Sequence, residues 1–372
     1  MKYGGITWWR NNYGSILQAY ALQEELKEFN NIDYEIICQY GKKIVSISNL
    51  YNKIHSIGLI GAINRAFWKY CVPALKKRTV NNQKFVDKYL NVSSREFSAN
   101  NIKDTNKIYD GFICGSDQIW NPTFSDATDI YRLHFVDDDK PKIAYAPSIG
   151  VKKLNSEQVK KYKSDLGRFT ALSCREKEGT DLINSIFGKE ICTTVLDPTL
   201  LVNKRIWEKI ISKRLVKDKY IFVYLLRGTK KQRKEIEKFA RKRNLKIVTI
   251  PFLETDYKVW YDLKFGDYKI WDATPADFLS LIKYSEYVFT DSFHSSVFSC
   301  IYHKSFFIFP KIGKAQSARL KNLITILGLP TRFIQREKDI YNLNSIDWIK
   351  VDKKINLEKN KSYHYLKKAL SI

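Results

Sequence analysis

Long apolar runs, paired metal-binding cysteines and low-complexity stretches are all missing from this sequence of 372 residues. No run of about 18 apolar residues could span a bilayer. The opening residues, MKYGGITWW, lack the basic region and the small-residue cleavage site of a secretory signal. We therefore expect a cytoplasmic protein without a membrane span.

Cysteine and histidine are both scarce, with six and five residues respectively. No CxxC motif or Cys/His cluster with metal spacing occurs, so we expect no metal site and no cofactor. The cysteines are far apart and lie mostly in apolar or strand-like runs, which predicts reduced, buried thiols. They are Cys38, Cys71, Cys114, Cys174, Cys192 and Cys300.

The charge is strongly one-sided, with a formal net charge of +25. Such a charge attracts nucleic acid, but the lysines are spread along the chain, and no zinc finger, RNP motif or helix-turn-helix pattern accompanies them. An anionic membrane surface, an anionic small substrate or a lysine-rich genomic bias explains the charge equally well. We expect no nucleic-acid partner.

Short β-branched or aromatic runs alternate with helical patterns, which predicts an α/β protein with parallel sheets. The length and the 44% hydrophobic content favour two domains, 1–200 and 201–372. Residues 41–105 predict a helical insertion, and the last thirty residues predict a helix that packs back on the first domain. Strands are expected at 3–7, 34–38, 108–114, 142–146, 171–173, 192–196, 220–226, 246–250, 287–290 and 305–309, and helices at 13–29, 204–212, 230–243, 275–284, 295–303 and 317–327.

Polar residues directly after strands are the candidates for chemistry, because ligands of open α/β sheets bind beyond the carboxyl ends of strands. After the first strand, Asn12 is a plausible helix cap, and Gly14 would let a substrate approach the backbone closely. After the strand at 108–114, the segment GSDQIWNP places Asp117 either to accept a sugar hydroxyl or to cap a helix.

Arg175 and His294 also follow strands. Arg175, in SCREKEG, either grips a phosphate or carboxylate with its guanidinium or pairs with a neighbour such as Glu178. In TDSFHSSVFS, Asp291 or Ser292 would cap the next helix and place His294 in its first turn. A lone histidine is more often structural than catalytic, but a place at the ligand edge favours a function.

Six segments, in this order and spacing, resemble the polysaccharide pyruvyl transferase family from about residue 4 to about residue 335: NNYGSILQAYALQ, YDGFICGSDQIWN, YAPSIG, SCREKEG, LDPTLL and TDSFHSSVFS. The resemblance implies a glycosyltransferase B-type arrangement, two Rossmann-like domains with the active site in the cleft between them. The acceptor is expected on the side of the first domain and the donor on the side of the second. The implied reaction transfers the enolpyruvyl carbons of phosphoenolpyruvate onto two hydroxyls of a sugar and makes a pyruvate ketal of a capsule-type surface polysaccharide.

The resemblance also implies roles for single residues. His294 matches the family histidine and is expected to be the general acid/base, and Arg175 matches an arginine associated with donor binding. Ser292 stands where members with demonstrated pyruvyl transfer carry a further donor arginine, and Arg227 is a donor-side candidate from its position alone. The acceptor-side candidates are Asn12, Asp117 and Ser148.

Two other functions stay open at this point. A glycosyltransferase that uses a nucleotide sugar in the same cleft is favoured by Ser292, and a basic nucleic-acid-binding protein is favoured by the net charge. Residues 57–78 predict either peripheral contact with the inner membrane face or a helix packed on the first domain. This segment combines Ile57, Leu59, Ile60, Ile63, Phe67 and Trp68 with Arg65, Lys69, Lys76, Lys77 and Arg78.

Overall fold

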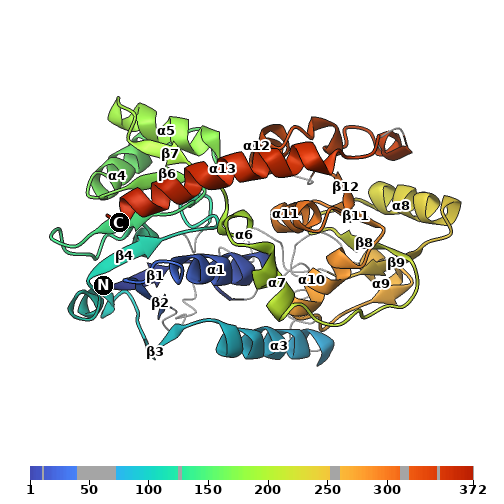
Figure 1. Cartoon of the computed structure of the whole chain (residues 1–372), viewed down its shortest axis with the longest axis horizontal. Helices are drawn as coiled ribbons and strands as arrows, with labels where there is room; N and C mark the ends of the chain where they lie inside the picture. The colour runs from blue at the N-terminus through green and yellow to red at the C-terminus, as the bar shows by residue number, and fades with distance from the viewer. Residues whose placement is uncertain are drawn as a thin grey trace.

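Two parallel five-stranded sheets face each other across the molecule (Figure 1). The structure is a computed structural model, and it describes residues 1–10, 12–39, 73–124, 128–251, 260–310, 318–341 and 344–371. The α/β class expected from the alternating pattern is confirmed.

The first sheet has the strand order β3-β2-β1-β4-β5. Its inner strand β4, GFIC, between β1 and β5, is buried along its whole length, as strands covered on both faces by helices are. A short parallel pair, β6 and β7, continues from β5 through a bridge between Ile143 and Ala171. The elements of this half are β1 (Lys2–Ile6), α1 (Tyr13–Leu26), β2 (Asp33–Cys38), α3 (Pro73–Tyr89), β3 (Val92–Glu96), β4 (Gly111–Cys114), β5 (Lys142–Ala144), α4 (Ser156–Leu166), β6 (Leu172–Cys174), α5 (Lys177–Phe187) and β7 (Cys192–Thr194).

Strand β3 corrects the expectation of a helical insertion at 41–105. Residues 73–89 form helix α3, as expected for a helical segment. Residues 92–96, however, pair in parallel with β2 and extend the sheet. The sequence VSSRE contains little apolar surface because β3 lies at the sheet edge with half-buried or exposed side chains. An edge strand of this kind has no apolar run by which to recognise it. Residues 41–72 lie outside the described ranges.

The second sheet has the order β10-β9-β8-β11-β12, and all of its pairs are parallel. Strand β8, YIFVY, lies at the centre of this sheet and is buried along its whole length. The elements of this half are β8 (Tyr220–Tyr224), α8 (Lys230–Lys242), β9 (Lys246–Thr249), α9 (Trp260–Lys264), β10 (Tyr268–Lys269), α10 (Pro275–Lys283), β11 (Tyr287–Thr290), α11 (Phe293–Ile301), β12 (Ser305–Ile308), α12 (Ala318–Ile326) and α13 (Trp348–Ala369).

Three helices join the two sheets. The short helices α6 (Pro198–Leu201) and α7 (Lys204–Ile210) carry the chain from one sheet to the other, so the expected boundary near residue 200 falls in α6. Helix α13 runs across both halves, shown in red in Figure 1. Its Asp352 accepts a contact from His303 Nε2 at 3.0 Å, and its Tyr365 hydroxyl donates to the Ala144 carbonyl at 2.8 Å. The helix therefore ties the second half to the first.

The start of α3 corrects part of the membrane expectation. Arg78 is buried, and its guanidinium donates to the carbonyls of Trp271 and Pro251 at 2.6 and 3.0 Å. Lys77 pairs with Asp272. Arg78 is therefore used inside the protein and is not available to a lipid surface, whereas the side chain of Lys77 stays 67% exposed. None of the helices in the described ranges is long and apolar enough to cross a bilayer.

The cysteine expectation is confirmed where the structure describes it. Five cysteines are buried free thiols, and Cys71 lies outside the described ranges. Burial raises the pKa of Cys114 and Cys300 above the ordinary value for a thiol. These thiols serve as small core residues.

Candidate active site

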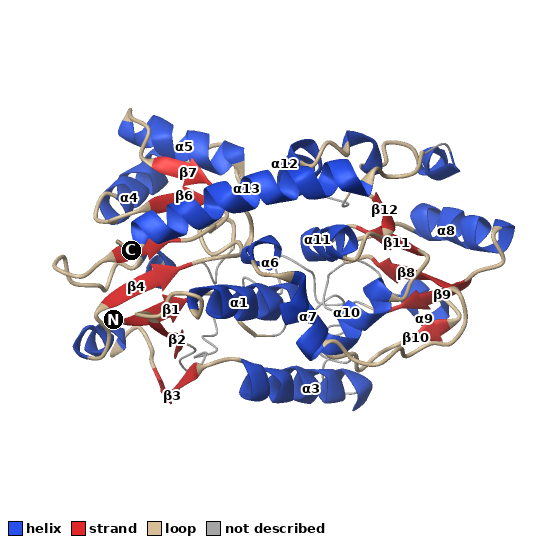
Figure 2. Ribbon diagram, viewed as in Figure 1, coloured by secondary structure: helices blue, strands red, loops and turns tan. Residues whose placement is uncertain are grey.

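The N-terminal ends of α1 and α11 meet between the two sheets (Figure 2). Asn12 caps α1 by accepting a hydrogen bond from the Gly14 amide at 2.8 Å, and Ser292 caps α11. The side chain of Tyr13 crosses to the second half, where its hydroxyl donates to the Ala273 carbonyl at 2.8 Å. Two helices from different halves are thus fixed end to end at the carboxyl edges of their sheets.

Ser292, and not Asp291, is the cap of α11, which begins two residues earlier than expected. Asp291 accepts hydrogen bonds from the backbone amides of Leu226 and Arg227, both at 2.7 Å. This buried carboxylate therefore ties the end of β8 to the end of β11. Arg227 lies at the same strand edge, and its side chain is half-buried.

His294 lies in the first turn of α11, and only 7% of its surface is exposed. Its ring fills the space beside Gly14, where a Cβ atom would lie 2.0 Å from His294 Nδ1. The expected close approach at Gly14 therefore exists, but the histidine of the other half makes it. Only glycine leaves room for this ring.

Arg175 and Asp197 form a buried ion pair next to His294. Arg175 Nη1 lies 2.7 Å from Asp197 Oδ2, and His294 Nε2 lies 3.7 Å from the same oxygen. Of the two alternatives for Arg175, a ligand grip or an ion pair with a neighbour such as Glu178, the second has the wrong partner: Glu178 is exposed, and Asp197 follows β7. The guanidinium also lies over the Phe293 ring, 4.5 Å from its centroid.

Asp197 uses both carboxylate oxygens. The amide and hydroxyl of Thr199 donate to Oδ1 at 3.0 and 2.6 Å, so the carboxylate caps α6. The Ser116 hydroxyl donates to Oδ2 at 3.1 Å. Burial would raise the pKa of Asp197, but His294, Arg175 and the Thr199 hydroxyl outweigh it and hold the pKa well below the usual range.

Asp117 lies on the other side of Arg175. Its Oδ2 accepts from the Ser15 hydroxyl of α1 at 2.6 Å, and its Oδ1 lies 3.8 Å from Arg175 Nη2. Burial opposes ionisation, but the charges of Arg175 and His294 and the Ser15 hydrogen bond lower its pKa. The turn before it needs glycine, because Gly115 has φ +123° and a Cβ there would lie 1.9 Å from the Tyr145 carbonyl oxygen.

Ser148 belongs to a neighbouring network around Glu176. Glu176 Oε1 accepts from the Ser148 hydroxyl at 2.9 Å and from the amides of Ile149 and Gly150 at 2.9 and 3.2 Å. Glu176 Oε2 is buried without a hydrogen-bond partner. This loop therefore brings an acidic oxygen to the border of the cluster.

The unused hydrogen-bonding capacity of the cluster consists mainly of donors. Arg175 Nε and Nη2 and Arg319 Nε are donors buried without a hydrogen-bond partner, His294 Nε2 and Ser295 Oγ are buried without one and can donate or accept, and Glu176 Oε2 is the one open atom that only accepts. Arg319 comes from α12, and only 6% of its surface is exposed. Buried polar groups in folded proteins are nearly always satisfied, so a set of open donors indicates a ligand rich in acceptors.

Sequence reasoning found part of this cluster. The structure brings the predicted residues Arg175, His294 and Asp117 together, with Ser148 at the border. Asn12 and Ser292 are at the site as helix caps. Four further cluster residues were missed: Ser15, Glu176, Asp197 and Arg319. Asp197 and Glu176 each lie just after a strand, so the pattern of a polar residue following a strand could have identified them. Arg319 lies inside a helix, where no such pattern marks it.

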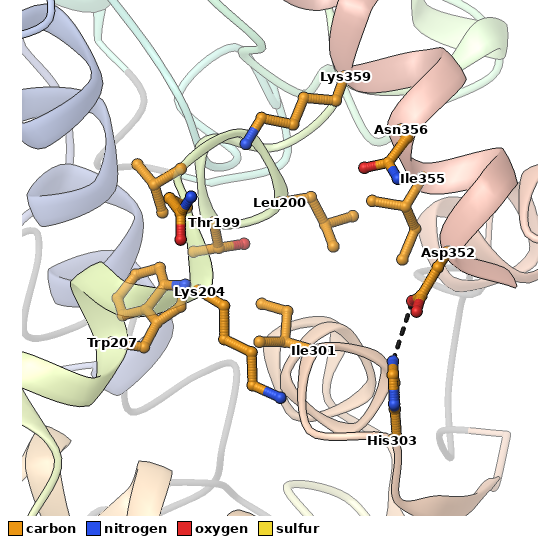
Figure 3. A pocket seen from close by; sticks show the side chains of 12 residues that line it. Thr199, Leu200, Lys204, Trp207, Ile301, His303, Asp352, Ile355, Asn356 and Lys359 are labelled. Carbon is orange, nitrogen blue, oxygen red and sulfur yellow. Dashed lines mark hydrogen bonds and ion pairs between the residues drawn. The ribbon is translucent and has the colours of Figure 1, made fainter. Parts of the chain in front are cut away.

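A separate pocket of about 310 Å³ lies on the other side of α6, beneath α13 (Figure 3). Its centre is apolar, with Leu200, Ile301 and Ile355, and Lys204 and Lys359 reach toward it from two sides. No cluster residue lines it. Within the described ranges, no group of three or more His, Cys, Asp or Glu side chains is placed to hold a metal ion.

Two facing Rossmann-like sheets with a buried polar cluster between them define a GT-B-like α/β protein. Solved structures support this class. The UDP-GlcNAc 2-epimerase from Neisseria meningitidis bound to UDP-GlcNAc has a TM-score of 0.53 at 10% identity, covering 100% of this chain and 99% of that one. The UDP-N-acetylglucosamine 2-epimerase from Rickettsia bellii has a TM-score of 0.52 at 11% identity, covering 99% and 98%. At such identities the likeness shows the fold.

The chain belongs to the polysaccharide pyruvyl transferase family, whose model matches residues 12–310. It is thus an enzyme of polysaccharide biosynthesis, and the family implies a pyruvyl donor and a polysaccharide acceptor. No curated protein matches the chain significantly.

Replacing Gly14 by alanine tests the packing of His294. Since the new methyl group would lie 2.0 Å from His294 Nδ1, the ring must leave its position. We expect turnover of the family reaction to fall at least about 100-fold, the contribution of a positioned acid–base group. Circular dichroism and the melting temperature show whether the variant is folded. Wild-type turnover in a folded Gly14→Ala protein would contradict the expectation that the His294 ring acts from its place beside Gly14.

Replacing Asp197 by asparagine tests the buried ion pair. Removing this partner deprives the buried Arg175 charge of its one hydrogen-bonded carboxylate, so we expect the free energy of unfolding at pH 7 to fall by about 3–5 kcal/mol. Folding lowers the pKa of Asp197, so the wild-type carboxylate contributes its stability above the ordinary aspartate pKa of 3.8 and loses it as pH falls further. Urea unfolding should therefore show that the difference in the free energy of unfolding between wild type and Asp197→Asn becomes smaller from pH 7 to pH 3. A difference that stays constant over this range would argue against the ion pair.

Proposed function

We propose that this enzyme transfers the pyruvyl group of phosphoenolpyruvate to a pair of hydroxyls on a surface-polysaccharide sugar, forming a pyruvate ketal. The observation that carries the proposal is the set of open donors around Arg175 and His294. Phosphoenolpyruvate offers the matching chemistry, because it carries a phosphate and a carboxylate within a few bonds of each other. A guanidinium with open Nε and Nη2 atoms matches such groups by two parallel hydrogen bonds.

The reaction needs proton transfer and a stabilised cationic carbon. In the proposed sequence, His294 delivers a proton to the methylene carbon, which becomes the methyl group of the ketal. One sugar hydroxyl attacks the adjacent carbon, phosphate leaves with its bonding electrons, and the second hydroxyl completes the ketal. The hydroxyls lose two protons: one balances the proton taken up by carbon, and the other leaves with phosphate.

The surroundings of His294 suit a general acid. Asp197 Oδ2 lies 3.7 Å from His294 Nε2, so a carboxylate held ionised stands beside the ring and offers a counter-charge to the proposed acid. Arg175 stays charged because Asp197 and Asp117 raise its pKa against the effect of burial. It is the proposed anion clamp for the donor and stabilises the charge of the leaving phosphate.

The remaining roles are part of the proposal. Asp117 and Ser148 are the acceptor-side groups, and Asn12 acts there by fixing the start of α1. Ser292 and Arg227 lie on the donor side. The hydroxyl of Ser292 accepts a hydrogen bond from the Ser295 amide at 3.5 Å. Its small, uncharged side chain cannot pair with the donor's anionic groups, so Arg175 and other cations would bind them.

Changing His294 to alanine tests the acid–base role. We expect the folded variant to transfer label from carbon-labelled phosphoenolpyruvate to polysaccharide precursors at least about 100-fold more slowly than wild type, the usual size of a general acid–base contribution. His134→Ala, at an exposed histidine outside the cluster, is the matched control and should keep wild-type turnover. Unchanged transfer by His294→Ala would remove the catalytic role.

The same assay with nucleotide sugars in place of phosphoenolpyruvate tests the donor. Transfer of a glycosyl group, without transfer from phosphoenolpyruvate, would replace the proposal by a glycosyltransferase. The likeness to epimerases crystallised with UDP-GlcNAc makes this the sharpest competing outcome.

We also propose peripheral contact with the inner membrane face through residues 57–78, of which 57–72 lie outside the described ranges and Lys76 and Lys77 are exposed. The motivation is the apolar and basic sequence of this segment. Wild-type protein should sediment with anionic vesicles at low salt and less so at high salt, because charge attraction to lipid is screened. A folded Phe67→Ser/Trp68→Ser variant should bind less. Wild-type protein that stays in the supernatant at low salt would exclude the contact.

A further inference from the structure

Arg319, in the first turn of α12, is a second buried arginine beside the cluster. Only 6% of its surface is exposed, and its Nε atom has no hydrogen-bond partner. One helical turn later, Asn322 Nδ2 donates to the Arg175 carbonyl oxygen at 3.5 Å. Residues three apart lie on the same face of a helix, so α12 presents Arg319 toward the end of β6.

The electrostatic surroundings of Arg319 are unfavourable without a ligand. Burial and the like charge of Arg175 lower its pKa to about 10, and Asp117, Glu176 and Asp197 only partly oppose this effect. Asp197 already accepts from Arg175, Ser116 and Thr199. A buried charge without a hydrogen-bonded partner is costly. The cluster therefore holds Arg319, which has no hydrogen-bonded partner, beside Arg175, which is paired with Asp197 but keeps Nε and Nη2 free of hydrogen bonds.

Each of the other buried arginines in the described ranges makes at least one hydrogen bond to a protein acceptor, including Arg332, whose Nη2 donates to the Asn344 carbonyl although its Nε is open. Arg132 Nε donates to Asp165 at 2.8 Å, and Arg233 donates to Asp262 at 2.8 Å and to the Gly228 carbonyl at 2.6 Å. Within the described ranges, Arg319 makes no hydrogen bond or ion pair. An arginine that served the fold alone would be expected to show partners of this kind.

We propose that Arg319 is a specificity-determining residue that, together with Arg175, forms a two-arginine site for a ligand bearing at least two negative charges. Applied to phosphoenolpyruvate, the inference rests on the proposed function. In that case one ligand anion bridges the two halves of the enzyme, because Arg175 follows β6 of the first half and Arg319 begins α12 of the second. Ser292, before α11, stands where related enzymes with pyruvyl transfer carry a donor arginine. In this chain Arg319 of α12 would supply that positive charge instead.

The test is equilibrium binding of phosphoenolpyruvate and of inorganic phosphate to full-length protein by calorimetry. Arg319→Gln should weaken binding of both anions by about 10- to 100-fold, the usual effect of losing a charged hydrogen bond. Lys321→Gln removes one positive charge from an exposed position of the same helix and is the matched control. It should bind both anions as wild type does.

A second measurement separates ligand binding from a structural role. Because the Arg319 charge is buried without a partner, Arg319→Gln should leave the melting temperature of the ligand-free protein unchanged or raise it by a few degrees. Each kcal/mol of added stability raises the melting temperature by about 2–4 °C. The same variant should lose most of the upward shift that phosphoenolpyruvate gives the wild type. Loss of several degrees without ligand would show that Arg319 holds the fold, and would overturn the inference.

The two anions keep this inference distinct from the donor assignment. If wild type binds phosphate but not phosphoenolpyruvate, the donor proposal fails, and the phosphate affinity of Arg319→Gln still decides the role of Arg319. Wild-type affinity of Arg319→Gln for the anions overturns the role of Arg319 while leaving the donor intact. Failure of wild type to bind either anion overturns both.

Discussion

The buried pair of Arg175 and Asp197 is the interaction on which the site depends. Asp197 accepts from Arg175, from the Ser116 hydroxyl after β4, and from Thr199 in α6. One carboxylate thereby joins two strand ends of the first half to the helix that leads into the second. The pair also leaves Arg175 Nε and Nη2 without hydrogen bonds, so it orients the guanidinium and keeps part of it for a ligand.

The second constraint is that the chemistry is divided between the halves. His294 starts α11 in one half, and the glycine that makes room for it starts α1 in the other. Tyr13 reinforces this contact by stacking on Phe278 with ring centroids 5.3 Å apart. Helix α13 bonds to both halves on the far side of α6. The relative position of the two sheets therefore sets the distance between His294 and Asp117.

Local sequence patterns predicted what depends on local structure. Each strand followed by a polar turn was recognisable, and this placed Arg175, Asp117 and His294 at carboxyl ends of strands, where ligands bind. Strand β3 was hidden because its VSSRE sequence lies at a sheet edge with little apolar surface. Pairings across the chain were not readable: Glu178 was a closer partner for Arg175 in sequence than Asp197. Arg319 was hidden for the same reason, because only the packing of α12 against the end of β6 brings it to Arg175.

The most direct measurement is a crystal structure of the enzyme with phosphoenolpyruvate and no acceptor. The account predicts the ligand between the sheets, with phosphate or carboxylate oxygens 2.7–3.2 Å, as in ordinary hydrogen bonds, from Arg175 Nε or Nη2 and its methylene carbon facing His294. Phosphoenolpyruvate bound elsewhere, for example in the pocket beneath α13, with the Arg175 and His294 donors still unpartnered, would contradict it.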